Sequence, residues 1–176
     1  MPDIVIADPS LVVLVGPAGA GKSTFAARHF APDEILSSDR FRAIVSGDEA
    51  DQGATGEAFA RLHRELARRL AEGRLTVVDA TNVERHARRA LLARAQTAGV
   101  PAVAVVLDLP AGEVVARNAA RAERVVAAAI VQRHLDRLRA ALDGPSASIG
   151  REGFAAIVVL RDPAEVDAVT IRRDPG

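Results

Sequence analysis

The sequence predicts an α/β fold in which a mainly parallel five-stranded sheet is flanked by helices. Three observations favour this fold class. Short apolar runs alternate with helical patterns along the 176 residues, the first run leads directly into a glycine-rich loop, and 49% of the residues are hydrophobic, enough for a full core. Strands separated by helices form right-handed crossovers, which build parallel sheets covered on both faces. We therefore expect a single domain over residues 1–176.

The expected strands are short runs rich in apolar residues. Leu11–Val15 is apolar throughout, as expected of a strand that is buried on both faces of a sheet. The other strands of the sheet are expected over residues 35–36, 76–79, 100–107 and 155–160, and a terminal strand is expected over 169–172.

The expected helices lie between these runs. Thr55 is suited to cap the helix that follows it, and Gly73 and Gly99 are suited to end two helices. Helices are expected from the glycine-rich loop to about residue 30 and over 40–45, 55–72, 84–98, 111–122, 125–142 and 163–167. Residues 47–53 and 144–150 are expected to be loops, and the helical pair over roughly 111–142, after the fourth strand, is expected to form a lid.

The composition excludes several classes of protein. The 23 basic and 23 acidic residues give a formal net charge of zero, so no strong general attraction to nucleic acid or membranes is expected. Cysteine is absent, which excludes disulfides, thiolate metal sites and cysteine nucleophiles. No apolar run approaches the length of a membrane span, and Met1–Ser10 contains acids where a signal peptide would be basic. These features predict a cytoplasmic protein.

The glycine-rich loop carries the strongest functional signal. Gly16–Ser23 (GPAGAGKS) fits the pattern G-x-x-x-x-G-K-[ST], and Lys22 within it is the only lysine of the chain. A compact ammonium can reach between the β- and γ-phosphates, whereas a broad guanidinium cannot easily do so. The loop therefore predicts a P-loop fold that binds ATP or another nucleoside triphosphate, with Mg²⁺ on the hydroxyl of Ser23. The expected nucleotide-binding residues of the loop are Gly16, Ala18, Gly19, Ala20, Gly21, Lys22, Ser23 and Thr24.

A candidate catalytic acid–base residue follows the second expected strand. Phosphoryl transfer to an alcohol needs a carboxylate near the γ-phosphate that accepts the hydroxyl proton, and Asp39 ends the neighbouring strand. Arg42 lies one turn further on, where it could hold a phosphate of the acceptor or the phosphate in transfer. The alternative is structural: Asp39 caps a short helix, and Arg42 is solvated. A dual role of Asp39 as cap and base is also compatible with the spacing.

The third expected strand ends in Asp79-Ala80-Thr81-Asn82. An apolar strand with a terminal Asp resembles a Walker B element, in which Asp79 would hold Mg²⁺ directly or through water. A buried strand can also end in Asp for purely structural reasons. Asn82 is suited to cap the next helix, and Thr81 and Asn82 are candidates for substrate binding. His63, expected on the acceptor side of the cleft, could also touch substrate, although a surface or core role is the ordinary one.

Three arginines follow the fourth expected strand. Arg117, Arg121 and Arg124 have helical spacing, so they are expected to share one face of a helix. One interpretation is a solvated face with acidic neighbours. The other is a lid whose arginines neutralise charge on the transferring phosphate. The position after the fourth strand favours the lid.

Taken together, these strings resemble the kinase module of the bacterial polynucleotide kinase–phosphatase that repairs RNA breaks. The resemblance extends from about Leu11 to Val169. Its most specific parts are Ser-Ser-Asp-x-x-Arg over 37–42 and Val-Val-Asp-Ala-Thr-Asn over 77–82. It also includes residues 19–26, Asp51-Gln52 with the following Thr55-Gly56, Arg117-Asn118 and residues 151–154.

The resemblance implies a role for each matching residue. Lys22 and Ser23 would engage the β- and γ-phosphates and the metal, and Asp39 would act as general base toward a 5′-hydroxyl. Arg42 would contact phosphate on the acceptor side. The lid arginine at the transferring phosphate would be Arg117, with help at the nucleotide from Arg121 and Arg124. The implied reaction is transfer of the γ-phosphate of ATP, or another NTP, to the 5′-OH end of RNA or DNA.

The sequence departs from this family in its extent. Those proteins also carry a metallophosphoesterase and a ligase-like adenylyltransferase. This chain has no Gly-Asn-His element for a binuclear phosphatase and no second lysine to form a lysyl-adenylate. The expectation is therefore a kinase that is either free-standing or linked to phosphatase and ligase domains in a parent protein. The end at Asp174-Pro175-Gly176, directly after a closing strand, favours the N-terminal domain of a longer protein.

Two alternatives remain open from the sequence. A small-metabolite or antibiotic kinase on the same scaffold would use the same Lys22 and Asp39, and the zero net charge mildly favours it. A nucleotide-dependent switch would bind NTP without phosphotransfer, and Asp39 argues against it because a switch needs no base toward an alcohol.

Overall fold

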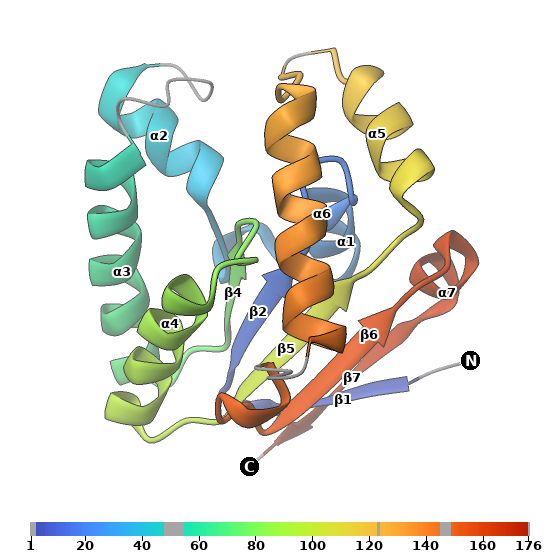
Figure 1. Ribbon diagram of the computed structural model, residues 1–176. Helices are drawn as coiled ribbons and strands as arrows, with labels where there is room; N and C mark the ends of the chain where they lie inside the picture. The colour runs from blue at the N-terminus through green and yellow to red at the C-terminus, as the bar shows by residue number, and fades with distance from the viewer. Residues whose placement is uncertain (1–2, 48–54, 123, 145–148, 176) are drawn as a thin grey trace.

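The computed structural model describes residues 3–47, 55–122, 124–144 and 149–175 (Figure 1). Its central sheet has five strands in the order β3-β4-β2-β5-β6, and every neighbouring pair is parallel. This sheet confirms the predicted fold class. The strands are β2 (Leu11–Val15), β3 (Ile35–Ser37), β4 (Thr76–Asp79), β5 (Ala102–Leu107) and β6 (Ala156–Leu160).

Helices cover both faces of the sheet and enclose two apolar clusters (Figure 1). One cluster includes side chains of α1 and α7, and the other includes side chains of α3 and α4, while α6 contributes to both. The helices are α1 (Lys22–His29), α2 (Ser38–Ser46), α3 (Thr55–Ala71), α4 (Arg85–Ala98), α5 (Ala111–Ala119), α6 (Ala128–Asp143) and α7 (Pro163–Ala168), with short 3₁₀ helices at Pro32–Glu34 and Ile149–Arg151. Within the described ranges, no helix combines the length and apolarity needed to cross a membrane.

A second, two-stranded sheet joins the two ends of the described chain. The sequence predicts a terminal strand, which exists as β7 (Thr170–Pro175), but its partner β1 (Asp3–Asp8) is not predicted. The two strands are parallel. The signal for β1 is short: only Ile4 and Ile6 are buried, between exposed neighbours and acidic ends. Such a segment becomes a strand because β7 lies beside it.

The segment between α5 and α6 differs most from the prediction. The sequence predicts helix to residue 122 and again from 125, but α5 ends at Ala119 and α6 begins at Ala128. The side chain of Asn118 provides the physical reason. Its amide donates to the Val126 carbonyl at 2.7 Å and its carbonyl accepts from the Val126 N–H at 3.1 Å, which closes a loop in place of helical hydrogen bonds. The prediction that Arg117, Arg121 and Arg124 share one helical face is therefore wrong.

Some predicted features lie outside the described residues. These are Asp51-Gln52, most of the loop expected over 47–53, and residues 145–148 of the loop expected over 144–150. Most other element boundaries agree with the prediction to within about two residues. The main exception is β7, which ends at Pro175 where the terminal strand was expected to end at 172.

Candidate active site

A cavity of about 470 Å³ lies over the carboxyl ends of the central strands. Open parallel sheets place their ligand sites at this edge. The cavity collects its lining from the glycine-rich loop, α1, α2, α3, the end of β4, and the segment from α5 to α6. The predicted site residues that line it are Ala18, Gly19, Ala20, Gly21, Lys22, Ser23, Thr24, Asp39, Arg42, Asp79, Thr81, Arg117, Arg121 and Arg124.

The glycine-rich loop wraps the amino group of Lys22. Gly19 and Gly21 have φ angles of 89° and 91°, which L-residues with a side chain rarely adopt. Lys22 is 9% exposed, and its Nζ donates to the carbonyls of Gly16 and Pro17 at 2.9 and 2.8 Å. Gly16 does not itself line the cavity but supplies one of these acceptors.

Burial lowers the pKa of Lys22 to about 8. The Asp79 carboxylate opposes this shift, whereas the positive charges of Arg121 and Arg124 add to it. A buried ammonium beside two guanidinium groups makes this end of the cavity strongly attractive to an anion.

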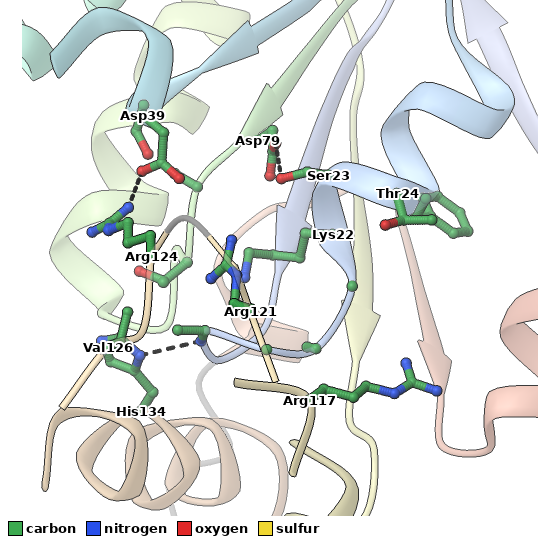
Figure 2. Close-up of a pocket in the computed structure, with 18 of the residues that line it drawn as sticks. Lys22, Ser23, Thr24, Asp39, Asp79, Arg117, Arg121, Arg124, Val126 and His134 are labelled. Carbon is green, nitrogen blue, oxygen red and sulfur yellow. Dashed lines mark hydrogen bonds and ion pairs between the residues drawn. The ribbon is translucent and has the colours of Figure 1, made fainter. Parts of the chain in front are cut away.

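Ser23 and Asp79 meet at the start of α1. The Ser23 hydroxyl donates to Oδ2 of Asp79 at 2.7 Å, and Asp79 is 7% exposed at the end of β4 (Figure 2). A hydroxyl and a carboxylate side by side are oxygen donors of the kind that Mg²⁺ prefers. Among the described residues, no group of three or more His, Asp, Glu or Cys side chains could form a metal cage. The donor set therefore fits a Mg²⁺ ion that takes its other ligands from phosphate and water.

Asp39 lies in the first turn of α2, just after β3, and faces the same cavity as Lys22. The prediction that its strand neighbours the strand before the glycine-rich loop is wrong, because β4 lies between β3 and β2. The residue that caps α2 is Ser37, whose hydroxyl accepts from the Arg40 N–H at 3.4 Å, so Asp39 is not the cap. Asp39 instead forms ion pairs with Arg42 and Arg124, and both arginines contact its Oδ1 (Figure 2).

Arg42 is not solvated. Its side chain is 6% exposed beside Asp39, one turn along α2, although it also lines the cavity. A buried guanidinium in contact with a carboxylate orients that carboxylate and favours its charged form. The geometry thus gives Arg42 a role in positioning Asp39 in addition to any contact with an incoming phosphate.

The three arginines after β5 approach the cavity from different positions. Arg117 belongs to the last turn of α5, and its Nη1 lies near Gly21, 3.6 Å from where a Cβ would be. Arg121 and Arg124 belong to the segment that Asn118 closes. Figure 2 shows Arg121 beside Lys22, Arg124 directed at Asp39, and Arg117 pointing away from Lys22.

Two predicted substrate-binding residues do not line the cavity. Asn82 is 4% exposed with φ 49°, and its amide donates to the Leu14 carbonyl at 2.8 Å, so it holds the end of β4 against β2. Glu84, not Asn82, is the N-cap residue of α4. His63 is half-buried on α3 outside the cavity. Thr81, next to Asn82, does line it.

The structure also adds residues that the sequence did not single out for the site. His134 of α6 lines the cavity, and its Nδ1 accepts from the Ala18 N–H of the loop at 3.4 Å. Burial lowers the pKa of His134, and the nearby charge of Lys22 lowers it further. Phe59 of α3 also lines the cavity. The spacing of these two residues in the sequence does not distinguish them from the residues that pack their helices against the protein.

The helix α5 is packed tightly on the glycine-rich loop. A Cβ built at Gly19 would lie 2.5 Å from the carbonyl oxygen of Val114 and 3.0 Å from the Cβ of Asn118. The first distance is too short for a real Cβ and the second is tight, so α5 can approach the loop this closely only because residue 19 is glycine. The loop therefore fixes the position of α5 and of Arg117 at its end.

Arg88 holds the segment that follows β4. Arg88 is 1% exposed and pairs bidentately with Glu152, both contacts at 2.7 Å. It also donates to the carbonyls of Asn82 and Val83 at 3.0 and 2.7 Å. Arg88 thus ties the segment after β4 to residues near β6.

Comparisons with known proteins agree with this geometry. The family model described as "AAA domain" matches residues 11–145. None of the curated proteins matches the sequence. Several solved structures share the fold at less than 25% identity, and we describe three of them.

The first is a chain of the Pnkp1/Rnl/Hen1 RNA repair complex, with a TM-score of 0.64 and 23% identity over 76% of this chain. This protein spans 45% of that chain, less than half its length. The second is shikimate kinase from Acinetobacter baumannii in complex with shikimate, with a TM-score of 0.54, 21% identity and coverage of 90% and 88%. The third is Kti12 from Chaetomium thermophilum in complex with ADP-AlF3, with a TM-score of 0.64, 18% identity and coverage of 89% and 93%. The shared fold is that of the P-loop kinases.

Proposed function

Because the chain belongs to the AAA domain family and has the fold of a P-loop kinase, we propose that it transfers the γ-phosphate of ATP or another NTP to the 5′-hydroxyl end of RNA or DNA. The observation that carries the proposal is that Asp39 and Lys22 face one cavity from the carboxyl ends of β3 and β2, which lie on either side of β4. A switch or binding protein needs no carboxylate on the acceptor side. A phosphotransferase that acts on an alcohol does.

The donor nucleotide would lie along the glycine-rich loop. Backbone N–H groups at a helix N-terminus bind anions. The N–H groups of the loop and of the first turn of α1 would therefore bind the phosphates of the nucleotide. Lys22 would leave the carbonyls of Gly16 and Pro17 and bind the β- and γ-phosphates, and Arg121 beside it would neutralise charge on the transferring group. Arg117, which points away from Lys22 in this structure, would turn toward the phosphates to do the same. Ser23 and Asp79 would hold Mg²⁺, which supplies charge neutralisation at the phosphate oxygens.

The acceptor hydroxyl would approach from the side of Asp39. Its oxygen attacks the γ-phosphorus, the bond from that phosphorus to the β,γ-bridging oxygen breaks, and the nucleoside diphosphate leaves. The hydroxyl proton passes to the Asp39 carboxylate. Arg42 holds this carboxylate in place throughout, because it is buried beside it.

The choice of a polynucleotide acceptor rests on two supports. The strings over 37–42 and 77–82 resemble those of the end-healing kinases, and two chains of Pnkp1/Rnl/Hen1 complexes share the fold, with TM-scores of 0.64 and 0.54. The cavity also carries Arg42 beside Asp39, where a backbone phosphate of the acceptor would lie. Phosphatase and ligase steps would belong to other domains or to partner chains.

The second candidate is a kinase of a small metabolite. The shared fold with shikimate kinase, over 90% of this chain, supports a small-molecule kinase, and the zero net charge is compatible with it. Both candidates assign the same roles to Lys22 and Asp39. The acceptor separates them.

A transfer assay discriminates between these functions. The protein is incubated with γ-labelled ATP, Mg²⁺ and matched RNA and DNA oligonucleotides that carry a 5′-OH, next to a panel of sugars and small alcohols. Label on an oligonucleotide supports the proposal, and the RNA and DNA arms give the preference. Label only on a small alcohol supports the metabolite kinase, and nucleotide binding without any transfer supports a switch.

A further inference from the structure

Arg124 connects the two halves of the cavity. It comes from the segment between α5 and α6, and its Nη1 is ion-paired with Oδ1 of Asp39 on α2 (Figure 2). It also lies near enough to Lys22 for its charge to act on that ammonium. A side chain between the phosphate-binding lysine and the acceptor-side carboxylate can interact with both ends of the reaction.

We propose that Arg124 exchanges partners when the nucleotide binds: it leaves Asp39 for the phosphates and thereby makes the base accessible to the acceptor. The inference rests on the proposed function, because it assigns a step to that same site. In this view Arg124 contacts the nucleotide phosphates once it has left Asp39, and it orders the reaction with the nucleotide first.

The charges favour this exchange. Asp39 offers Arg124 one negative charge, shared with Arg42, whereas a triphosphate on Lys22 brings several negative charges into the same cavity. A guanidinium also binds phosphate oxygens bidentately, with the planar geometry that suits it best. Arg42 stays beside Asp39, so the carboxylate keeps one cation after Arg124 leaves.

The other phosphate-directed donors show the same arrangement. Lys22 donates to the loop carbonyls of Gly16 and Pro17, Ser23 donates to Asp79, and the Ala18 N–H donates to His134. Each donor is thus bonded to an acceptor of the protein that a phosphate oxygen can replace. Arg124 differs in one respect, because its acceptor is the candidate base.

The exchange requires only a small movement. Val126, two residues beyond Arg124, is held at both its N–H and its carbonyl by Asn118, which is itself 5% exposed. The base of the segment is therefore pinned, and the long side chain of Arg124 can turn between partners while the backbone stays in place.

A double-mutant cycle on nucleotide affinity tests the proposal without any acceptor. The Kd of a non-hydrolysable ATP analogue with Mg²⁺ is measured by calorimetry for the wild type, Asp39→Asn, Arg124→Ala and the double variant. Asp39→Asn releases Arg124 in advance, so we expect tighter binding by about 5-fold, within the range of typical coupling energies. In the Arg124→Ala background, Asp39→Asn should change the Kd by less than about 2-fold.

A matched background separates partner exchange from general charge effects. Arg121 lines the same cavity and acts on Lys22, as Arg124 does, but among the contacts of the described residues it is not a partner of Asp39. In an Arg121→Ala background, Asp39→Asn should still tighten binding of the ATP analogue by about 5-fold. An equal gain in the Arg124→Ala background, or loss of the gain in the Arg121→Ala background, overturns the proposal.

A second measurement uses the unmodified site. The side-chain ¹⁵Nε signal of Arg124, assigned with Arg124→Lys, should shift as the wild type is titrated with the analogue. An unchanged signal at saturation also overturns the proposal. Both measurements are independent of the transfer assay. If the expected Kd pattern is found but no phosphate is transferred to an oligonucleotide, the proposed function is refuted. If transfer is normal but the Kd pattern is absent, only the partner exchange of Arg124 is refuted.

Discussion

The hydroxyl of Ser23 and the carboxylate of Asp79 are hydrogen-bonded at 2.7 Å, which joins the start of α1 to the end of β4. The two residues are 56 positions apart in sequence, and the parallel pairing of β2 with β4 brings them together. This contact is the part of the site that would hold Mg²⁺, and the first prediction follows from it.

Asp79→Asn should raise the Mg²⁺ concentration needed for half-maximal phosphotransfer. The amide keeps the shape of the side chain but removes its charge, and loss of such a partner typically weakens metal binding by about 10-fold or more. The measurement is the transfer rate against Mg²⁺ concentration. Asp108→Asn is the control, because Asp108 pairs with Arg161 outside the cavity. Equal Mg²⁺ dependence of the wild type and Asp79→Asn would refute the assignment.

Arg88→Met should destabilise the fold strongly. It leaves Glu152, whose side chain is fully buried, without its bidentate partner, and breaking a buried pair from one side costs about 3 kcal/mol or more. The exposed neighbour Arg89 is the matched control, and Arg89→Met should change stability by less than about 0.5 kcal/mol. Urea unfolding measures both. Similar midpoints for the two variants would show that the pair with Glu152 does not stabilise the protein.

Gly19→Ala should be far more damaging than Gly47→Ala. Both glycines have positive φ, 89° and 79°, so both substitutions carry the backbone cost of about 1 kcal/mol. Only at Gly19 would the new Cβ overlap α5, 2.5 Å from the Val114 carbonyl, whereas nothing lies within 4 Å at Gly47. Thermal unfolding and nucleotide binding should both be impaired in Gly19→Ala alone. Matching behaviour of the two variants would argue against tight packing of α5 on the loop.

Nucleotide binding should take up a proton near pH 8. Burial lowers the pKa of Lys22 to about 8, so its ammonium loses its proton as the pH rises through that value. A triphosphate favours the charged form and raises the pKa again, so affinity should fall between pH 7 and pH 9. Calorimetry at pH 8 in buffers of different ionisation enthalpy measures the proton taken up. Arg121 and Arg124 keep their charge over this range, so uptake that survives in Lys22→Met would contradict the assignment to Lys22.

The sequence was sufficient for the parts of the molecule that depend on local patterns. The apolar run Leu11–Val15 and the glycine-rich loop that ends at Ser23 predicted a strand of the sheet and the phosphate-binding site. Both predictions depend only on residue types at fixed spacing within one short segment. The alternation of runs predicted the parallel sheet, and the sheet in turn brings Asp39 and Asp79 to one edge.

The rest depends on contacts between distant residues. β1 is a strand because of β7, and Arg88 is buried because Glu152, 64 residues away, neutralises it. Asn118 ends α5 early through the backbone of Val126, so a helical wheel misplaced Arg121 and Arg124. His134 reaches the loop from a helix that follows it by more than a hundred residues. No local pattern contains this information.

The central claim is that Asp39 accepts the hydroxyl proton opposite the phosphate held by Lys22. Its most direct test is single-turnover transfer from γ-labelled ATP to a 5′-OH oligonucleotide by the wild type and by Asp39→Asn, with the Kd of the ATP analogue measured on both. The account predicts a loss of at least about 100-fold in the transfer rate with nucleotide binding retained or tightened. Transfer at the wild-type rate by Asp39→Asn, or equal loss of transfer and nucleotide binding, would contradict it.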